Sequence, residues 1–411
     1  MKKNNLKHAP ITQFPQNKGC LQIGGIPLSR LAQRVGTSPF YAYDRQLITD
    51  RITLLRKYLP TDIQIYYAMK ANPMPAVVQH LATLVDGLDV ASAGELRVAL
   101  DTTVPPNQIS FAGPGKKDTE LKCAIASGII LNIESEQEMK RISILGQCLS
   151  IRPKVAIRVN PNFELKSSGM KMSGGGKQFG IDAEHVPSIL AQMNTLELNF
   201  KGFHIFCGSQ NLNAEAIQKT QEQILELFLR LAKHAPNPVL LLNIGGGFGV
   251  PYFPGENALD IKLACKNLHR LAEKIKKSTP NTKIAIELGR YIVAESGIYV
   301  CRVLERKISR KQVFLVTDGG LHHHLAASGN FGQVIRKNYP VVVGNKITGH
   351  KKEVVTIVGP LCTPLDLLAE EIEVAKADTG DLIVVFQSGA YGLTASPTKF
   401  LNHPAPIEVL V

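Results

Sequence analysis

Tryptophan is absent from the sequence, and the basic residues are not interleaved with aromatic residues. Such interleaving is what a surface that stacks on nucleic-acid bases requires. Lys and Arg total 47 and Asp and Glu total 34, which gives the 411-residue chain a net charge of +13. Because these charges are dispersed, we expect a solvated basic surface or a site for anionic substrates and partners, and no nucleic-acid partner.

Disulfide, zinc and membrane signals are also missing. The seven cysteines are odd in number, are scattered and contain no Cys-x-x-Cys pair, which fits a reducing compartment better than a disulfide framework or a zinc site. The charged N-terminal segment is not followed by the apolar stretch of a signal peptide, and no run of about 18 apolar residues occurs. We therefore expect a soluble, cytoplasmic protein without membrane insertion.

Hydrophobic residues make up 44% of the chain and charged residues 20%, so a large core can be buried. Between residues 37 and 290, apolar runs typical of strands alternate with segments of helical periodicity. The strand-like runs are Pro39–Tyr43, Ile63–Ala68, Gly87–Val90, Gln108–Phe111, Ile129–Asn132, Lys154–Val159, Phe200–Ile205, Val239–Ile244 and Lys283–Glu287. Repeated βα units of about 30 residues predict an α/β fold, a TIM (β/α)8 barrel, with a doubly wound sheet as the alternative.

After residue 290 the pattern changes to strands with few helical segments between them. These strands are expected at Ile298–Leu304, Gln312–Asp318, Val341–Val343, Val354–Val358, Asp381–Phe386 and Glu408–Val411. The change predicts a C-terminal, mostly antiparallel β domain over residues 291–411, after a barrel over residues 37–290.

One lysine lies at a position where the active site of a barrel is expected. Lys70 lies just beyond the apolar run Ile63–Ala68, and the carboxyl ends of barrel strands form the active-site face. Apolar neighbours disfavour the ammonium form, which would make Lys70 a competent Schiff-base nucleophile. An ordinary solvated loop lysine is the alternative.

Three later segments could bind a planar, phosphorylated cofactor. Gly245–Gly247 follow a buried run and could bring backbone N–H groups to a phosphate, although neither a dinucleotide fingerprint nor a Walker A loop is present, and a tight turn is the alternative. Glu287 and Arg290 could bind a ring nitrogen and a phosphate, or pair with each other. His204 and Phe206 share one face of a strand, so either ring could stack on the cofactor.

Two further features leave alternatives open. His322–His324 lack a carboxylate or cysteine at ligand spacing, so we expect no metal site there. Cys362 is either a reactive thiol or a small buried residue. The glycine-rich segment Lys166–Lys177 is either a plain connection or a mobile lid.

The order of these motifs resembles a known family. The motifs are Tyr-Ala-Met-Lys-Ala-Asn, Leu-Asp-Val-Ala-Ser-Ala-Gly-Glu-Leu, Gly-Ser-Gln, Gly-Gly-Gly-Phe-Gly, Glu-Leu-Gly-Arg, Gly-Pro-Leu-Cys and Gly-Ala-Tyr. From about residue 20 to residue 411, the chain resembles the fold-type III pyridoxal-phosphate decarboxylases, which include the ornithine, arginine and diaminopimelate decarboxylases. The resemblance is closest to the decarboxylases associated with the exosortase A system, and extends to decarboxylases of carrier-protein-bound amino acids.

The resemblance implies a barrel that holds pyridoxal 5'-phosphate, and a C-terminal β domain to which residues 1–36 contribute a strand. It makes Lys70 the Schiff-base lysine, Asp89 the acid near that lysine, and Glu287 the partner of the pyridine nitrogen. It makes Cys362 the donor of a proton to the carbanion, lent by the neighbouring subunit of a homodimer with shared active sites. The further cofactor-binding positions are Arg158, His204, Phe206, Ser209, Gly245, Gly246, Gly247, Gly289, Arg290 and Tyr391.

Departures from the family pattern concern the substrate, for which Thr363, Asp366 and Tyr391 are the candidate residues. Phe206 occupies the position of the family's ring-stacking histidine, and Thr363 follows Cys362 where ornithine and diaminopimelate enzymes carry Asp or Glu. The substrate arginine of diaminopimelate enzymes has no equivalent within His322–Asn330.

We therefore predict pyridoxal-phosphate-dependent α-decarboxylation of a free amino acid or of an amino-acyl group bound to a carrier protein. The alternatives are diaminopimelate decarboxylation, amino-acid racemisation, and a protein that binds the cofactor without catalysis. The complete β domain with Cys362 and Tyr391 disfavours the last of these.

Overall fold

The computed structural model describes residues 6–166, 169–333, 336–348 and 350–411. Contacts between residues divide the chain into two compact units. We call residues 51–250 and 259–291 the barrel unit, and residues 1–50, 251–258 and 292–411 the β unit. Each unit has its own sheet and is described separately.

The barrel unit is built on a closed parallel sheet. Its strands are β5 (Ile63–Ala68), β6 (Gly87–Val90), β7 (Ile109–Phe111), β8 (Ile130–Ile133), β9 (Lys154–Asn160), β12 (Asn199–His204), β14 (Leu241–Gly246) and β15 (Lys283–Leu288). Neighbours pair in the order β9-β12-β14-β15-β5-β6-β7-β8, and β8 pairs with β9 in parallel, which closes the ring. The predicted TIM barrel is thus confirmed, and the doubly wound alternative, an open sheet, is wrong.

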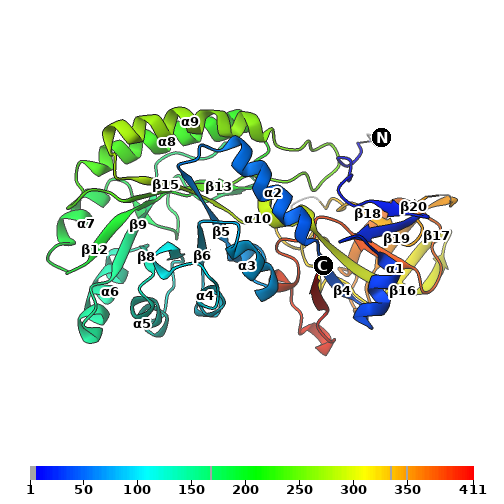
Figure 1. Ribbon diagram of the computed structural model, residues 1–411. Helices are drawn as coiled ribbons and strands as arrows, with labels where there is room; N and C mark the ends of the chain where they lie inside the picture. The colour runs from blue at the N-terminus through cyan, green and yellow to red at the C-terminus, as the bar shows by residue number, and fades with distance from the viewer. Residues whose placement is uncertain (1–5, 167–168, 334–335, 349) are drawn as a thin grey trace. The chain divides into compact units, whose positions relative to one another are not determined.

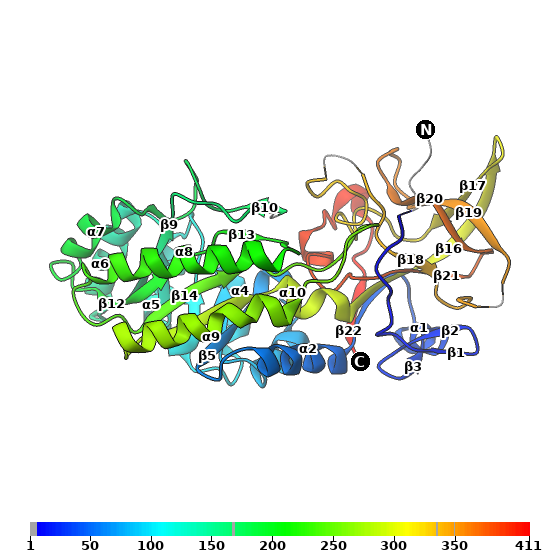
Figure 2. The ribbon, with the colours of Figure 1, turned by 90° about the horizontal axis from the view of Figure 1, so that it is seen from above.

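One helix before β5 and further helices between the barrel strands lie along the outside of the sheet (Figure 1). They are α2 (Arg45–Tyr58), α3 (Pro75–Ala82), α4 (Ala93–Leu100), α5 (Asp118–Ser127), α6 (Glu136–Leu149), α7 (Val186–Gln192), α8 (Ala214–Ala232) and α9 (Ile261–Ser278). Side-chain caps start several of them: Ser92 accepts from the Glu95 amide, and Asn213 from the Ala216 amide. The long helices α8 and α9 lie side by side in both Figure 1 and Figure 2.

Because helices cover the sheet, the strands are largely buried on both faces. Every residue of β6, β7 and β8 is buried. An interior layer of the barrel is formed by one side chain from each of five strands. These residues are Tyr66, Ile130, Ala156, Leu241 and Ala285.

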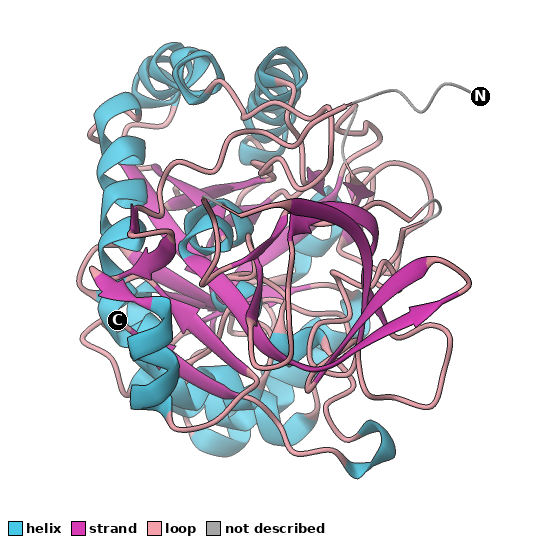
Figure 3. Cartoon of the chain, turned by 90° about the vertical axis from the view of Figure 1, so that its right-hand side faces the viewer, coloured by secondary structure: helices cyan, strands magenta, loops and turns pink. Residues whose placement is uncertain are grey.

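The β unit contains the second sheet. Its strands are β4 (Phe40–Tyr43), β16 (Gly297–Ser309), β17 (Gln312–Thr317), β18 (Val341–Val343), β19 (Lys352–Val358), β20 (Leu367–Ala375), β21 (Leu382–Val385) and β22 (Ile407–Leu410). Among the described residues of this second sheet, only the β17–β19 and β4–β22 pairs are parallel. Long paired strands of this kind are drawn in magenta in Figure 3. The predicted, mostly antiparallel β domain is confirmed.

One strand was expected in the wrong sheet. Residues Phe40–Tyr43 do not belong to the barrel, because β4 pairs with β16 and β22. All four residues are buried. A short, fully buried apolar run suits the interior of either sheet, so its sequence cannot tell the two apart.

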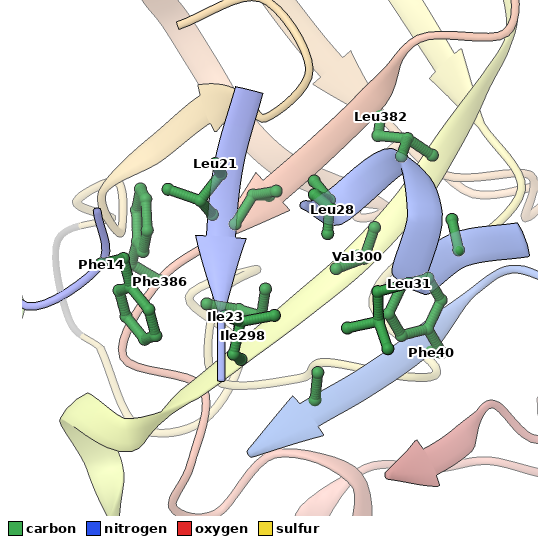
Figure 4. Packing of buried hydrophobic residues seen from close by; sticks show 13 residues of the cluster. Phe14, Leu21, Ile23, Leu28, Leu31, Phe40, Ile298, Val300, Leu382 and Phe386 are labelled. Atoms are coloured by element: carbon green, nitrogen blue, oxygen red, sulfur yellow. The ribbon is translucent and has the colours of Figure 1, made fainter. Parts of the chain in front are cut away.

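The N-terminal segment supplies part of the core of the β unit. Strands β1 (Gln16–Asn17), β2 (Cys20–Ile23) and β3 (Ile26–Pro27) form a small sheet, and helix α1 (Leu28–Val35) follows. Figure 4 shows side chains of β2 and α1 packed against side chains of β16 and β21. Phe14 stacks on Phe386 with ring centroids 5.7 Å apart. Among the helices of the described residues, none combines the length and apolar composition needed to span a bilayer.

Candidate active site

The carboxyl ends of the barrel strands bring together charged residues that are far apart in the chain. Lys70 follows β5, Asp89 lies in β6, and Arg158 lies in the second half of β9. His204 is the last residue of β12, and Glu287 lies near the end of β15. This is the end at which TIM barrels carry their active sites.

Glu287 is the best-connected member of this group. Its side chain is buried, and its Oε2 atom lies 3.1 Å from Nε2 of His204 and accepts a hydrogen bond of 3.2 Å from Nδ2 of Asn243. Its Oε1 atom lies 3.8 Å from Nζ of Lys70. Burial alone would raise the pKa of Glu287, but His204, Lys70 and Arg158 together lower it below the ordinary value. Glu287 therefore stays ionised at neutral pH.

Asp89 behaves in the opposite way. Its carboxyl group is buried and accepts a hydrogen bond of 2.7 Å from Oγ of Ser110. Burial and the charge of Glu287 raise the pKa of Asp89 well above its ordinary value, although Lys70 opposes this shift. Two carboxyl groups whose pKa values shift in opposite directions therefore share this end of the barrel, as expected for two acids that repel each other.

The two candidate stacking rings have different surroundings. His204 is buried against Glu287, and its Nδ1 atom has no hydrogen-bond partner among the described residues. Phe206 is only partly buried, and Nζ of Lys70 lies 5.6 Å from the centre of its ring. The partly exposed ring of Phe206 therefore lies beside the amine of Lys70, whereas the ring of His204 is buried.

The glycines at the end of β14 and directly after it leave the backbone accessible. Gly245 and Gly247 have φ angles of +64° and +80°, which side chains disfavour. A Cβ atom on Gly245 would lie 2.6 Å from the ring of Phe206, and one on Gly247 would strike the carbonyl oxygen of Gly208. A Cβ atom on Gly246 would strike the carbonyl oxygen of Glu287. The bare backbone here suits close approach of a phosphate.

The remaining barrel positions of the predicted site lie nearby in the fold. A Cβ atom on Gly289 would lie 2.9 Å from the carbonyl oxygen of Ala68, so this glycine allows β15 to pass the end of β5. Arg290 is the first residue of α10 (Arg290–Val293), directly after β15. Ser209 lies in β13 (Gly208–Ser209), which pairs with β10 (Met170–Lys171).

The glycine-rich segment Lys166–Lys177 is attached to this strand through its backbone. The Gly169 amide donates to the carbonyl oxygen of Gln210, and the Met172 amide donates to that of Cys207. Two of its residues, 167 and 168, lie outside the described residues. The segment therefore runs alongside the position of Ser209.

Arg158 is held by other protein groups. Its Nη1 atom forms an ion pair of 2.8 Å with Oε1 of Glu134, and its guanidinium lies 4.8 Å from the ring centre of Phe179. Glu134 and Asn243, which were missed from the sequence, therefore belong to the supporting structure of the site. The sequence position of Asn243, two residues before Gly245, could have indicated its role. In the structure its Oδ1 atom accepts a hydrogen bond from the Gly245 amide.

The β unit carries the other predicted residues. Cys362 is exposed and unpaired, in the turn before β20, and Thr363 is partly exposed beside it. Asp366 is buried, and its carboxylate accepts hydrogen bonds from the amides of Leu321 and Leu361, of 2.6 and 2.8 Å. Its two oxygens thus tie the Cys362 turn to the segment that follows β17.

Tyr391 has a left-handed backbone, with φ of +53°, and its ring stacks on Phe331 at 6.5 Å. Both residues lie in the β unit. His322–His324 form a buried turn in the same unit, and the ring centres of His322 and His323 are 3.6 Å apart.

Comparisons with known proteins agree with these features. Residues 45–294 match the family model described as pyridoxal-dependent decarboxylase, pyridoxal binding domain. The chain is 39% identical over 393 residues to an L-glutamyl-acyl-carrier-protein decarboxylase of Niallia circulans, covering 93% of this chain and 90% of the relative. It is 33% identical over 396 residues to a diaminopimelate decarboxylase of Aquifex aeolicus, covering 96% and 91%. The crystal structure of a diaminopimelate decarboxylase from M. jannaschii with L-lysine superposes with a TM-score of 0.87, at 25% identity, covering 97% of this chain and 92% of that one.

Proposed function

Because the chain belongs to the family of pyridoxal-dependent decarboxylases, we propose that it removes the α-carboxylate of an amino-acyl group carried by an acidic carrier protein. The protein is thus a pyridoxal-phosphate-dependent decarboxylase, and the proposal concerns its substrate and the roles of its residues. The observation that carries the proposal is the 39% identity, over nearly the whole chain, to a decarboxylase of a carrier-bound glutamyl group.

The residues at the carboxyl end of the barrel fit the cofactor. Lys70 supplies the amine for covalent attachment, Glu287 an ionised carboxylate for the pyridine nitrogen, and Gly245–Gly247 a bare backbone for the phosphate. When bound, pyridoxal phosphate supplies an electron sink for the electron pair that remains as the carboxylate leaves. We assign Ser209, Gly289, Arg290 and Tyr391 to the phosphate.

Glu287 would keep a proton on the ring nitrogen of the bound cofactor, because its carboxylate remains ionised in a buried site. His204 holds Glu287 in place through the 3.1 Å contact, which makes His204 a positioning residue. Phe206, whose ring is partly exposed beside Lys70, would stack on the bound cofactor. The charge of Arg158 lowers the pKa of Glu287, and the ion pair with Glu134 orients the Arg158 side chain.

Cys362 is the proposed source of the proton that replaces the lost carboxylate. Its exposure in the β unit supports a role toward a second copy of the chain, in a homodimer with shared sites. Large apolar residues near the same turn are also exposed: Phe331 by 43% and Leu365 by 58%. Asp366 is a positioning residue for the turn, since backbone amides occupy both of its oxygens.

The charge of the chain supports a carrier-bound substrate. Thr363 has no charge to pair with the distal ammonium of a free diamino acid, and leaving such a group unpaired costs about 1–3 kcal/mol or more. The net charge of +13 attracts an acidic carrier protein instead.

The test is a panel of substrates with purified holoenzyme. Carbon dioxide release is measured with free L-glutamate, free meso-diaminopimelate, free ornithine and a glutamyl group loaded on an acyl-carrier protein. We expect kcat/KM for the carrier-bound group to exceed that of each free amino acid by ~10²-fold or more. Racemisation without carbon dioxide release, or turnover of diaminopimelate alone, would refute the proposal.

A further inference from the structure

The amino end of the barrel contains a cavity of about 460 Å³ that is separate from the candidate active site. Its walls come from the beginnings of strands: Lys154 opens β9, Lys283 opens β15, and Lys201 lies in the first half of β12. Catalytic residues of such barrels lie at the carboxyl ends of the strands. This cavity, which we call the basic cavity, is therefore not part of the site that contains Lys70.

The inner end of the basic cavity is closed by apolar side chains. Tyr66, Ile130 and Leu241 line it and also belong to the interior layer of the barrel. This layer separates the cavity from the carboxyl end of the strands. A ligand in the basic cavity would therefore bind independently of the cofactor and the substrate.

The lysines of the basic cavity have no carboxylate among the lining residues. Nζ of Lys154 donates to the carbonyl oxygen of Gly128 at 3.0 Å, and this neutral partner does not compensate the charge of Lys154. Burial lowers the pKa of Lys201, and the neighbouring charges of Lys154 and Arg152 lower it further. Asp86, which precedes β6 at the same end of the barrel, is already paired with Arg56 at 2.6 Å.

Crowding like charges in a partly enclosed space is unfavourable, and an anion removes that cost. The remaining polar lining consists of the Tyr66 hydroxyl and of side-chain amides. The amides, among them Gln64, Asn107 and Asn281, can donate hydrogen bonds to oxygen atoms. The volume falls within the range of about 300–1,000 Å³ that small-molecule sites occupy.

We propose that the basic cavity binds a small polyanion, a molecule with two or more phosphate or carboxylate groups held by Lys154, Lys201 and Lys283. The separation by the interior layer makes this a second ligand site on the barrel. The site is independent of the proposed reaction and of the identity of its substrate.

The test uses holoenzyme, in which the cofactor already occupies the catalytic end. Pyrophosphate and citrate are titrated separately by calorimetry at constant ionic strength, so that the stronger ligand shows whether phosphate or carboxylate is preferred. We expect one saturable site for at least one of them. The Lys154→Gln/Lys201→Gln double variant should bind ~10-fold more weakly or worse, since two charged partners are lost.

Lys277→Gln is the matched control, because Lys277 is an exposed lysine at the end of α9 that does not line the cavity. It should bind the anions as the unmodified protein does. Lys283→Gln, at an exposed strand start, gives a second cavity variant if the double variant fails to fold. The absence of saturable binding, an equal loss in the control, or capture only of an acidic protein would overturn the proposal.

Discussion

Lys70 stands two residues beyond β5, with 40% of its side chain exposed at the carboxyl end of the barrel. An amine in this position is open to attachment of the cofactor, whereas Lys116, the lysine paired with Glu138, is buried. We predict that borohydride reduction of holoenzyme fixes the cofactor to Lys70, as peptide mass spectrometry would show. Lys70→Ala should carry no fixed cofactor, and the exposed control Lys57→Ala should carry it fully. Attachment retained in Lys70→Ala would contradict the assignment.

Asp89 and Glu287 should respond differently to loss of charge. The pKa of Asp89 is raised and that of Glu287 is lowered, so Glu287 carries a negative charge over the wider pH range. Asp89→Asn keeps a group that can bond to Ser110, so we expect kcat to fall by less than ~10-fold. Glu287→Gln removes the charge that we propose for the ring nitrogen, and the expected loss in kcat is ~10²-fold or more.

Steady-state kinetics of both variants, with cofactor content measured by absorbance, would separate these outcomes. The matched comparison is Asn243→Asp, which leaves the Glu287 charge intact but replaces its amide partner with a like charge. Equal losses in the Asp89 and Glu287 variants would contradict the proposal that Glu287, and not Asp89, supplies the charge for the ring nitrogen.

At the scale of elements, the barrel strands were the most predictable part of the molecule. Each of the eight barrel strands was expected within two residues of its observed ends, because buried parallel strands are short, apolar and separated by helices. β4 was assigned to the wrong sheet, since its partners β16 and β22 lie more than 250 residues away in the chain. Such pairings leave no local signal. β20 was missed because glutamates interrupt its apolar residues.

The site was predictable in part for the same reason. Lys70, Glu287 and the glycines lie at the carboxyl ends of strands or just beyond them, so their place in the sequence indicates their place in the barrel. The contacts of Glu134 with Arg158, and of His204 with Glu287, join separate strands and follow from side-chain directions that the sequence does not specify.

The His322–His324 turn makes the β unit sensitive to acid. Burial, followed by the neighbouring charges of His323 and His403, lowers the pKa of His322 from 6.5 to about 3. Burial likewise lowers that of His324 to about 3. Below pH 6.5 the unfolded chain therefore binds protons that the folded chain does not, and stability falls as the pH decreases from 6.5 toward 3.

Thermal unfolding between pH 7.5 and about pH 4 measures this effect. His322→Leu should weaken the pH dependence, and it loses no hydrogen bond because neither ring nitrogen of His322 has a partner within the described part of the chain. His234→Gln, which changes an exposed histidine of the barrel unit, should leave the dependence unchanged. An identical pH profile for His322→Leu and the unmodified protein would count against the buried turn as its source.

At the scale of the whole molecule, Lys70 and Cys362 belong to different units. Each active site is proposed to combine Lys70 of one subunit with Cys362 of another. Mixing inactive Lys70→Ala and Cys362→Ala proteins should then restore up to about a quarter of the activity, because about half of the randomly exchanged dimers contain both variants and one complete site of two. Cys362→Ala alone should bind cofactor and lose ~10²-fold in kcat. Cys148→Ala, which removes another exposed cysteine, should remain active. Exchange of subunits without any rescue would indicate a self-contained site.

The positive charge is a property of the whole chain and affects how it meets charged partners. A net charge of +13 accelerates encounter with an acidic carrier, and salt screens this attraction over about 10 Å at 0.1 M. A small free amino acid gains little from such steering. The salt dependence of kcat/KM therefore distinguishes a tethered substrate from a free one.

The most direct test is release of labelled carbon dioxide from a carboxyl-labelled glutamyl group on its carrier protein, measured as kcat/KM from about 0.05 to about 0.5 M salt. Free labelled glutamate mixed with unloaded carrier is the control. We predict fast release from the tethered group that slows by ~10-fold or more as salt rises, and slow, nearly salt-independent release in the control. Equal rates for the tethered and free substrates, or efficient salt-insensitive decarboxylation of free meso-diaminopimelate, would contradict the account.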